Sequence, residues 1–318
     1  MALDSRPVAV RKEDGSEVKI LILRYSALGD VVMTSWTATA LKQALPECQI
    51  TWAIQPRCAP LVSSDLAETV LVPRDRGERN SFLAMVRFGL ELRKERFDWG
   101  LDFQGHAKTA IPLRIAAPRS RLSLRATDVA TALIARPTPS PPSLAHIVER
   151  EAWLAAKVTH ISLPSSPILP RVELQPRMDS RPLVTVQMGT GWQGKEYPAD
   201  LMSQAMRLLE AEGCRVVALG GPNDPHPEAG EDLVGRTDLQ QTLSWIKSSR
   251  VHLAPDTGTG HMAAALGVPV VSIFGPEDPE KCRPWGLKVT VLKQGSRTSD
   301  VSPDQAASAV MKALEGGR

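Results

Sequence analysis

A short polar turn with the sequence Asp-Thr-Gly-Thr-Gly-His occupies residues 256–261, between two apolar segments. Residues 251–254 before it and 268–274 after it are predicted strands, and the Ala-rich residues 262–266 are a predicted helix. Such a turn presents free backbone N–H groups and the positive end of a helix dipole to the same point. The pattern predicts a phosphate-bearing ligand at the carboxyl ends of parallel strands.

The side chains of this turn have two interpretations each. Asp256 and Thr257 either cap the helix or hydrogen-bond a sugar or phosphate. His261, one turn into the helix, either packs in the interior or contacts the ligand.

Asp30 ends a second strand-to-helix turn, which begins at Arg24. Aspartate is a favoured helix N-cap, a role that contributes about 1 kcal/mol. The carboxyl end of a strand is also where ligand sites form in open parallel sheets. Asp30 is therefore a candidate helix cap and a candidate general base.

Residues 189–194 match the Gly-x-Gly-x-x-Gly pattern of dinucleotide-binding loops. The context opposes that reading, because Pro198 starts the helix after the glycines and the next strand ends in Gly220-Gly221. The nearest acid, Asp224, lies beyond those glycines. A phosphate contact through the glycine backbone and Lys195 remains, with a solvated surface lysine as the alternative.

Two further groups of polar residues accompany the predicted elements. Residues 102–108, which contain Gln104 and Lys108, follow a predicted strand. His146 and Arg150 are spaced to share one helix face, and the alternative for them is a surface pair.

The composition is that of a two-domain globular protein: 318 residues, 42% hydrophobic and 23% charged. The net charge is +3. Residues 1–150 hold 21 Lys and Arg against 16 Asp and Glu, with the basic excess concentrated in 108–136. That stretch is either a solvated face or a patch that attracts an anionic partner.

Predicted strands and helices alternate along almost the whole chain. We predict an α/β protein with two doubly wound, parallel-sheet domains. The N-terminal domain spans residues 1–165, a proline-rich linker spans 166–182, and the C-terminal domain spans 183–318. A last helix over 303–315 is expected to end the chain and to pack back on the N-terminal domain.

The four cysteines are scattered and have no clustered histidines, so neither a zinc site nor a disulfide framework is expected. The chain shows no signal-peptide core and no apolar run of membrane-spanning length. We therefore expect a cytoplasmic protein that can rest on a membrane surface.

Five motifs occur in one order between residues 18 and 286. They are Arg24 with Ser26-Ala27-Leu28-Gly29-Asp30, Asp102-Phe103-Gln104-Gly105 with Lys108, Gly189-Thr190-Gly191-Trp192 with Lys195, Asp256-Thr257-Gly258 with His261, and Phe274-Gly275-Pro276 with Asp278-Pro279. Together they resemble glycosyltransferase family 9, whose main members are the lipopolysaccharide heptosyltransferases.

The resemblance implies a GT-B fold, in which two Rossmann-like domains face a cleft. It implies inverting transfer of heptose from ADP-L-glycero-D-manno-heptose without cofactor or metal. Asp30 is then the general base. The implied donor-binding residues are Thr190, Gly191, Lys195, Gly221, Asp224, Asp256, Thr257, Gly258 and His261.

The resemblance also implies an anionic, lipid-linked acceptor of the Kdo-lipid A type, met at the cytoplasmic face of the inner membrane, and no nucleic-acid partner. The implied acceptor-binding residues are Ser26, Gly29, Gln104, Lys108, His146 and Arg150. Thr259-Gly260 and Glu196-Tyr197 depart from the family pattern, and Glu196 lies beside Lys195.

Three other classes of function stay open at the level of sequence. One is a family member that uses another nucleotide sugar or a protein acceptor. A second is a non-catalytic nucleotide-sugar-binding protein, against which Asp30 argues. The third is a nicotinamide-dependent oxidoreductase, which the glycine pattern suggests and its context opposes.

Overall fold

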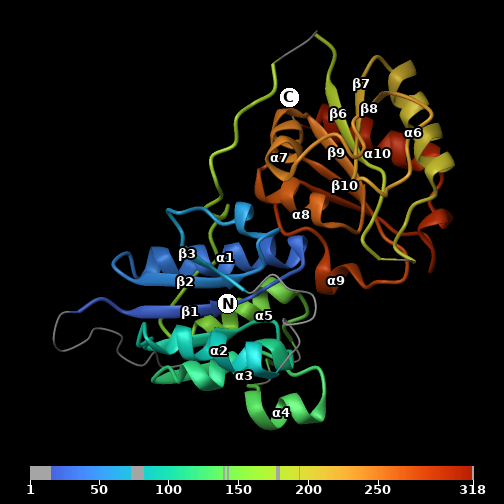
Figure 1. The fold of residues 1–318 in the computed structure, drawn as a ribbon. Helices are drawn as coiled ribbons and strands as arrows, with labels where there is room; N and C mark the ends of the chain where they lie inside the picture. The colour runs from blue at the N-terminus through green and yellow to red at the C-terminus, as the bar shows by residue number, and fades with distance from the viewer. Residues whose placement is uncertain are drawn as a thin grey trace. The chain divides into compact units, whose positions relative to one another are not determined.

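The protein is described by a computed structural model over residues 16–72, 82–138, 140–141, 143–176, 180–192 and 194–316. Its internal contacts divide the chain into two compact units, Met1–Pro170 and Arg171–Arg318. Each unit is a parallel sheet flanked by helices (Figure 1). The division falls within the proline-rich segment 166–182, whose described residues form neither helix nor strand.

Unit 1 contains five parallel strands in the order β3-β2-β1-β4-β5. The central strand is a continuous apolar run, as expected where helices cover both faces of a parallel sheet. The strands are β1 (Lys19–Leu23), β2 (Gln49–Ile54), β3 (Glu68–Leu71), β4 (Trp99–Asp102) and β5 (Ser120–Ser123).

Helices cover this sheet on both sides. In unit 1, α1 packs against α5, while α2, α3 and α4 form a continuous layer on the other side of the strands (Figure 1). The helices are α1 (Leu28–Ala44), α2 (Phe82–Arg93), α3 (Ala107–Ala116), α4 (Val129–Ala135) and α5 (Ile147–Ala155), with a 3-10 turn, η1, at Ala59–Leu61.

The first helix begins earlier than the sequence pattern predicts. A helix capped by Asp30 would begin at Val31, but α1 begins at Leu28, with Ala27 as its N-cap residue. Asp30 therefore lies inside the first turn of α1 rather than before it. The interpretation of Asp30 as the N-cap residue itself was wrong.

Unit 2 has six parallel strands in the order β11-β10-β9-β6-β7-β8. The strands are β6 (Leu183–Gln187), β7 (Arg215–Leu219), β8 (Glu231–Asp232), β9 (Val251–Pro255), β10 (Val270–Ile273) and β11 (Val289–Leu292). Its helices are α6 (Ala199–Ala211), α7 (Leu239–Ser248), α8 (Gly258–Ala265), α9 (Pro279–Cys282) and α10 (Pro303–Glu315), with a 3-10 turn, η2, at Thr298–Asp300.

The last helix is part of unit 2. α10 packs on α6 and on strands β9, β10 and β11, and its Ala306 and Val310 belong to the buried core of that unit. Figure 1 shows α6 and α10 on one side of the strands and α7 and α8 on the other. The expected return of this helix to the N-terminal domain stays a prediction.

In each sheet the order in which strands are added reverses once. In unit 1 the chain leaves β1 for β2 and later returns to place β4 on the other side of β1. In unit 2 the equivalent point lies between β6 and β9. Ligands of open parallel sheets bind at the carboxyl ends of strands at such switch points. These two edges are where chemistry is expected.

Candidate active site

The switch point of unit 1 is built around a buried arginine. Arg24 follows β1, and its guanidinium is fully buried. Its Nη2 makes a close ion pair with Glu151 of α5, and its Nε donates to Thr34 Oγ1 of α1 at 3.2 Å. The Arg24 carbonyl accepts from Trp52 Nε1 at 3.1 Å. The arginine thus ties β1 to α1, α5 and β2.

Asp30 is the partly exposed carboxylate above this arginine. Its Oδ2 lies 3.8 Å from Arg24 Nη1 and accepts the Ala27 N–H at 3.2 Å. The side chain is 37% exposed. Both contacts with described residues use Oδ2.

Asp102 also lies at the carboxyl end of the unit 1 sheet, as the last residue of β4. Its Oδ1 accepts the N–H groups of Gln104 and Gly105, both at 2.9 Å, and its Oδ2 accepts from Thr109 Oγ1 at 3.0 Å. Complete burial raises the pKa of Asp102 to about 6, although these donors and Arg24 act in the opposite direction. Its contacts point to a structural role, holding the loop after β4.

Burial and the opposite charges act against each other in the Arg24–Glu151 pair. Burial alone would lower the pKa of Arg24, but the charges of Glu151 and Asp30 raise it above its ordinary value. Burial raises the pKa of Glu151, and the charge of Arg24 opposes that shift. One buried cation therefore faces several acids.

The predicted acceptor residues divide into two sets. Ser26, Gly29 and Gln104 lie on the segments after β1 and β4, and Gln104 Oε1 accepts the Tyr25 N–H at 2.7 Å. Lys108 is in the first turn of α3, which begins just after the β4 loop. These four come from the carboxyl edge of the sheet.

His146 and Arg150 make different contacts from those that their spacing predicts. His146 is the N-cap of α5 and not a helical residue, and its Nδ1 accepts the Val148 N–H at 3.2 Å. Arg150 Nε donates to Ser140 Oγ at 2.9 Å. The prediction that His146 is a helical residue is therefore wrong, because its ring caps the helix from which Arg150 projects.

In unit 2, three charged residues meet near the switch point. Lys195 Nζ contacts Asp256 Oδ2 at 2.7 Å and lies 3.6 Å from Glu277 Oε1. Burial alone would lower the pKa of Lys195, but Asp256 and then Glu277 raise it above its ordinary value. The alternative of a solvated surface lysine is wrong, since Lys195 is half-buried and paired with carboxylates.

The surrounding field is negative. Burial raises the pKa of the Cys282 thiol to about 12, and the charges of Asp256, Glu277 and Asp278 add to that shift. Lys293 Nζ donates to the carbonyls of Gly275 and Glu277, which fixes the loop that carries Glu277.

The turn that opens α8 follows β9 directly. Thr257 is its N-cap, and Thr257 Oγ1 lies 3.0 Å from Thr259 Oγ1. Gly258 is the first residue of the helix, and His261 is buried in its first turns. The predicted strand–turn–helix unit is present, with the N–H groups of the first turn at the carboxyl edge of the sheet.

A cavity of about 470 Å³ opens at the ends of β6 and β7. It brings together three predicted donor residues, Thr190, Gly191 and Asp224, with Trp192 and Tyr197 in its wall. Asp224 Oδ2 accepts the Gly221 N–H at 2.7 Å. A Cβ added to Gly189 would lie 2.1 Å from Asp224 Cγ, so glycine is required there by the aspartate.

The glycine loop does not have dinucleotide geometry. α6 begins at Ala199, after Gly194, so the helix does not open within the glycines. A Cβ added to Gly191 would have no atom of the described residues within 4 Å. The space above this glycine is open to a ligand.

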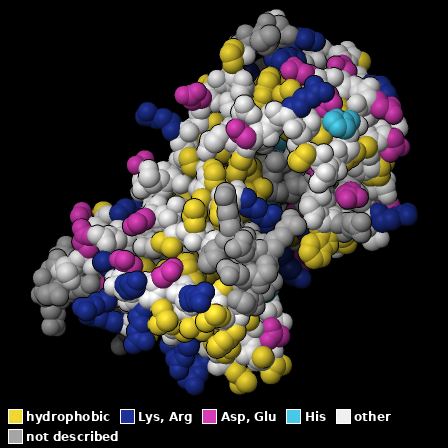
Figure 2. Space-filling model, in the orientation of Figure 1, with side chains coloured by type: hydrophobic (Ala, Val, Ile, Leu, Met, Phe, Trp, Pro, Cys, Tyr) yellow, Lys and Arg dark blue, Asp and Glu magenta, His cyan; other side chains and the backbone are white. Residues whose placement is uncertain are grey.

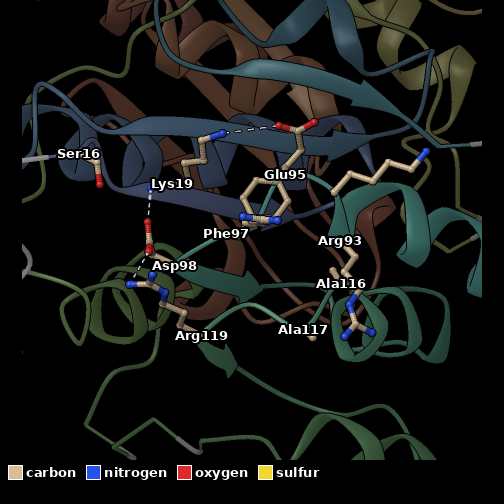
Figure 3. Close-up of a pocket in the computed structure, with 11 residues that line it drawn as sticks. Ser16, Lys19, Arg93, Glu95, Phe97, Asp98, Ala116, Ala117 and Arg119 are labelled. Atoms are coloured by element: carbon tan, nitrogen blue, oxygen red, sulfur yellow. Dashed lines mark hydrogen bonds and ion pairs between the residues drawn. The ribbon is translucent and has the colours of Figure 1, made fainter. Parts of the chain in front are cut away.

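A larger cavity, of about 560 Å³, lies at the opposite edge of unit 1. Figure 3 shows Lys19 directed at Glu95, with Asp98 held by Arg119 and by the backbone N–H of Lys19. These residues lie at the amino ends of β1 and β4 and near the carboxyl ends of α2 and α3. Basic side chains there offset the helix dipoles, which gives them a structural role.

Sequence reasoning missed Glu151 and Glu277. Glu151 is separated from Arg24 by 127 positions, and only the fold brings them together. An arginine directly after a buried strand is a signal that an acid must lie nearby, but it does not identify the acid. Glu277 follows the Phe274-Gly275-Pro276 motif, and its position beside Lys195 has no sequence signal.

Within the described residues, no three His, Cys, Asp or Glu side chains are grouped to hold a metal ion. In the same part of the chain, no helix is long and apolar enough to cross a membrane.

Two Rossmann-like units of this kind are the architecture of the GT-B fold. Residues 85–310 match the profile of glycosyltransferase family 9 (heptosyltransferase), and the chain belongs to that family. It is an enzyme, a glycosyltransferase.

Individual relatives agree with this assignment. Lipopolysaccharide heptosyltransferase 1 of Pseudomonas aeruginosa is 27% identical over 82% of this chain and 80% of its own length. The family 9 glycosyltransferase of Veillonella parvula matches with a TM-score of 0.80 at 17% identity, covering 94% of this chain and 97% of that one. Escherichia coli heptosyltransferase WaaC, solved with ADP, matches at 0.74 and 21%, covering 95% and 100%. The solved structures share the fold.

Proposed function

We propose that the protein transfers heptose from ADP-L-glycero-D-manno-heptose to the Kdo/heptose inner core of lipopolysaccharide, with inversion at the anomeric carbon. Relatives named lipopolysaccharide heptosyltransferase support the sugar and the acceptor. A structural neighbour solved with ADP supports the nucleotide. We place the protein in the cytoplasm, at the inner membrane, because such an acceptor is lipid-linked.

Asp30 is the proposed general base. Inverting transfer needs one base to remove the acceptor proton as the hydroxyl attacks the anomeric carbon. Asp30 is the partly exposed acid at the switch point of unit 1, and Arg24 lies 3.8 Å behind it. The pairing of Arg24 with Glu151 fixes the position of the arginine.

Four residues of unit 2 are proposed to bind the departing diphosphate. Lys195 supplies a charge, Thr190 a hydroxyl, and the first turn of α8 at Thr257 and Gly258 supplies backbone N–H groups. Oriented donors of this kind stabilise developing negative charge without reorganisation. We propose that they serve in place of a metal ion.

The remaining donor residues are proposed to hold the other parts of the nucleotide sugar. Gly191 and Asp224 line the cavity at the ends of β6 and β7, beside Gly221, and are proposed to receive the nucleoside. Asp256 and His261 are proposed to shape the sugar site at the end of β9.

The proposed acceptor site lies in unit 1. Ser26, Gly29, Gln104 and Lys108 come from the edge that holds Asp30. Arg150 belongs to α5, the helix that also carries Glu151, and His146 is the N-cap residue of that helix. Lys108 and Arg150 would pair with the carboxylates and phosphates of the acceptor.

The observation that carries this proposal is the Asp30–Arg24–Glu151 arrangement at the switch point of a family 9 fold. The test is incubation of the protein with ADP-heptose and a deacylated Kdo2-lipid A, in the presence and absence of EDTA. We expect ADP release that depends on the acceptor, a heptosylated product with inverted configuration by NMR, and no effect of EDTA. Release that needs no acceptor, or a retained configuration, would overturn it.

A further inference from the structure

Unit 1 exposes apolar side chains on the helical layer formed by α2, α3 and α4. On α4, Val129 is 80% exposed and Leu133 is 75% exposed. On α2, the exposed residues are Phe82, Leu83 and Leu90. Single exposed apolar residues are ordinary, but five on two helices of one layer are not. Figure 2 shows hydrophobic side chains gathered over this layer, with Lys and Arg beside them.

Basic residues lie on the same exposed helix faces as these apolar residues. Val129, Leu133 and Arg136 are spaced i, i+4 and i+7 along and just beyond α4. On α2, the exposed stripe alternates Leu83, Arg87, Leu90 and Lys94 with the same spacing. A helix face that mixes apolar and basic residues is typical of helices that lie in a membrane interface.

Three arginines lie on and beside α4 and the neighbouring α3 and β5. Arg114, Arg121 and Arg136 form no ion pair with any acid in the described part of the chain. Burial, followed by the charges of Arg114 and Arg136, lowers the pKa of Arg121. The cluster therefore favours an anionic partner, which would relieve this repulsion.

The surface is continuous with the proposed acceptor site. Arg125 Nε donates to the Gln104 carbonyl at 3.2 Å, and the Thr127 N–H donates to the Gly105 carbonyl at 3.0 Å. Asp128 then caps α4 through the Thr131 N–H at 2.7 Å. The loop after β4 and the exposed helix are thus held together by hydrogen bonds.

We infer that the exposed faces of α2 and α4 dock unit 1 on an anionic lipid bilayer. Val129 and Leu133 enter the headgroup region, while Arg114, Arg121 and Arg136 meet the lipid phosphates. The choice of a bilayer rests on the proposed function, because its acceptor is lipid-linked. The docked surface would present the loop after β4 to the sugar of that acceptor.

The test is co-sedimentation with vesicles of phosphatidylcholine, with and without phosphatidylglycerol. Wild-type protein should bind the anionic vesicles, and less so at high salt. The double variant Val129→Asp/Leu133→Asp should bind at least about tenfold more weakly. Leu287→Asp is the matched control, because Leu287 is 92% exposed but belongs to unit 2. Equal binding by both variants, or no binding by wild type, would overturn the inference.

A second readout separates this inference from the proposed function. The double variant should keep wild-type transfer to a soluble, deacylated acceptor, and lose it with an acceptor embedded in vesicles. Vesicle binding without any transfer would contradict the proposed function and leave the docking surface intact. Sedimentation velocity tests whether a second copy of the chain binds this surface instead. If wild type is a dimer and the double variant is a monomer, the surface is an interface between copies, and the bilayer assignment is overturned.

Discussion

Arg24 determines the electrostatics at the switch point of unit 1. Its guanidinium is fully buried, and the charges of Glu151 and Asp30 compensate for its lost hydration. Glu151 is equally buried and serves the arginine, whereas Asp30 is partly exposed and can serve a substrate. Two acids next to one cation thus have separate roles because they differ in exposure.

Removing the buried acid should destabilise the protein strongly. Glu151→Gln leaves Arg24 without its main counter-charge and should reduce the free energy of unfolding of unit 1 by about 3–5 kcal/mol. Urea unfolding measures it, with Glu91→Gln on the exposed face of α2 as the control. Arg24→Met/Glu151→Leu should recover much of the stability but not the transferase activity. Equal midpoints for Glu151→Gln and Glu91→Gln would contradict the role of the pair.

If Lys195 binds the donor diphosphate as proposed, Glu277 competes with that diphosphate for the lysine. Its carboxylate is 3.6 Å from Lys195 Nζ and is half-exposed, so removing its charge should free the lysine without disturbing the buried Asp256. Glu277→Gln should bind ADP roughly threefold to tenfold more tightly by calorimetry. Glu280→Gln on α9 should not change ADP affinity. Weaker ADP binding by Glu277→Gln would show that this carboxylate supports the donor instead.

At the scale of elements, alternation of short apolar runs with helical segments was sufficient to predict two α/β units. The sequence pattern predicts helices over 81–94, 108–115 and 144–158, and α2, α3 and α5 lie there. The segment after α3 gave no clear pattern, yet it forms β5 and α4. β5 is an edge strand with only one buried residue, and α4 has a mostly exposed face, so neither shows a buried period.

Prediction of the site from sequence is limited to residues that are close together in the chain. Turns such as 256–261 can be recognised because strand, turn and helix are adjacent in the chain. The Lys195–Asp256 contact joins residues 61 positions apart, and the Arg24–Glu151 pair joins residues 127 apart. Such pairs depend on strand order, which local patterns do not determine.

A buried histidine in β9 should make the stability of unit 2 depend on pH. His252 Nδ1 lies 3.0 Å from Thr185 Oγ1 of β6, and complete burial lowers its pKa to about 3. The unfolded chain takes up this proton near 6.5, so stability is present above that pH and is lost as pH falls from 6.5 toward 3.

The loss attributable to His252 is at most about 1.4 kcal/mol for each pH unit. His252→Asn should make unfolding less dependent on pH across that window, measured by urea titration at several pH values. His160→Asn, at an exposed position, is the control. An unchanged pH dependence in His252→Asn would contradict the assignment of a neutral, buried imidazole.

At the scale of the whole molecule, the two units repeat one architecture with different charge. The basic excess of the sequence lies in unit 1, whose proposed acceptor is anionic. In unit 2, the proposed contacts with the leaving group come from the N-terminus of α8 and from Lys195, which lies beside Asp256 and Glu277. The proposed reaction takes its base from unit 1 and its leaving-group contacts from unit 2, so each unit should retain binding when the other is impaired.

The decisive measurement is acceptor-dependent ADP release by wild type and Asp30→Asn, together with ADP-heptose affinity for both proteins. Loss of the base should lower the rate of release by about 10²- to 10⁴-fold, while donor affinity stays unchanged because Asp30 belongs to unit 1. Release by Asp30→Asn within about threefold of wild type, at equal donor affinity, would contradict the assignment of Asp30 as the base.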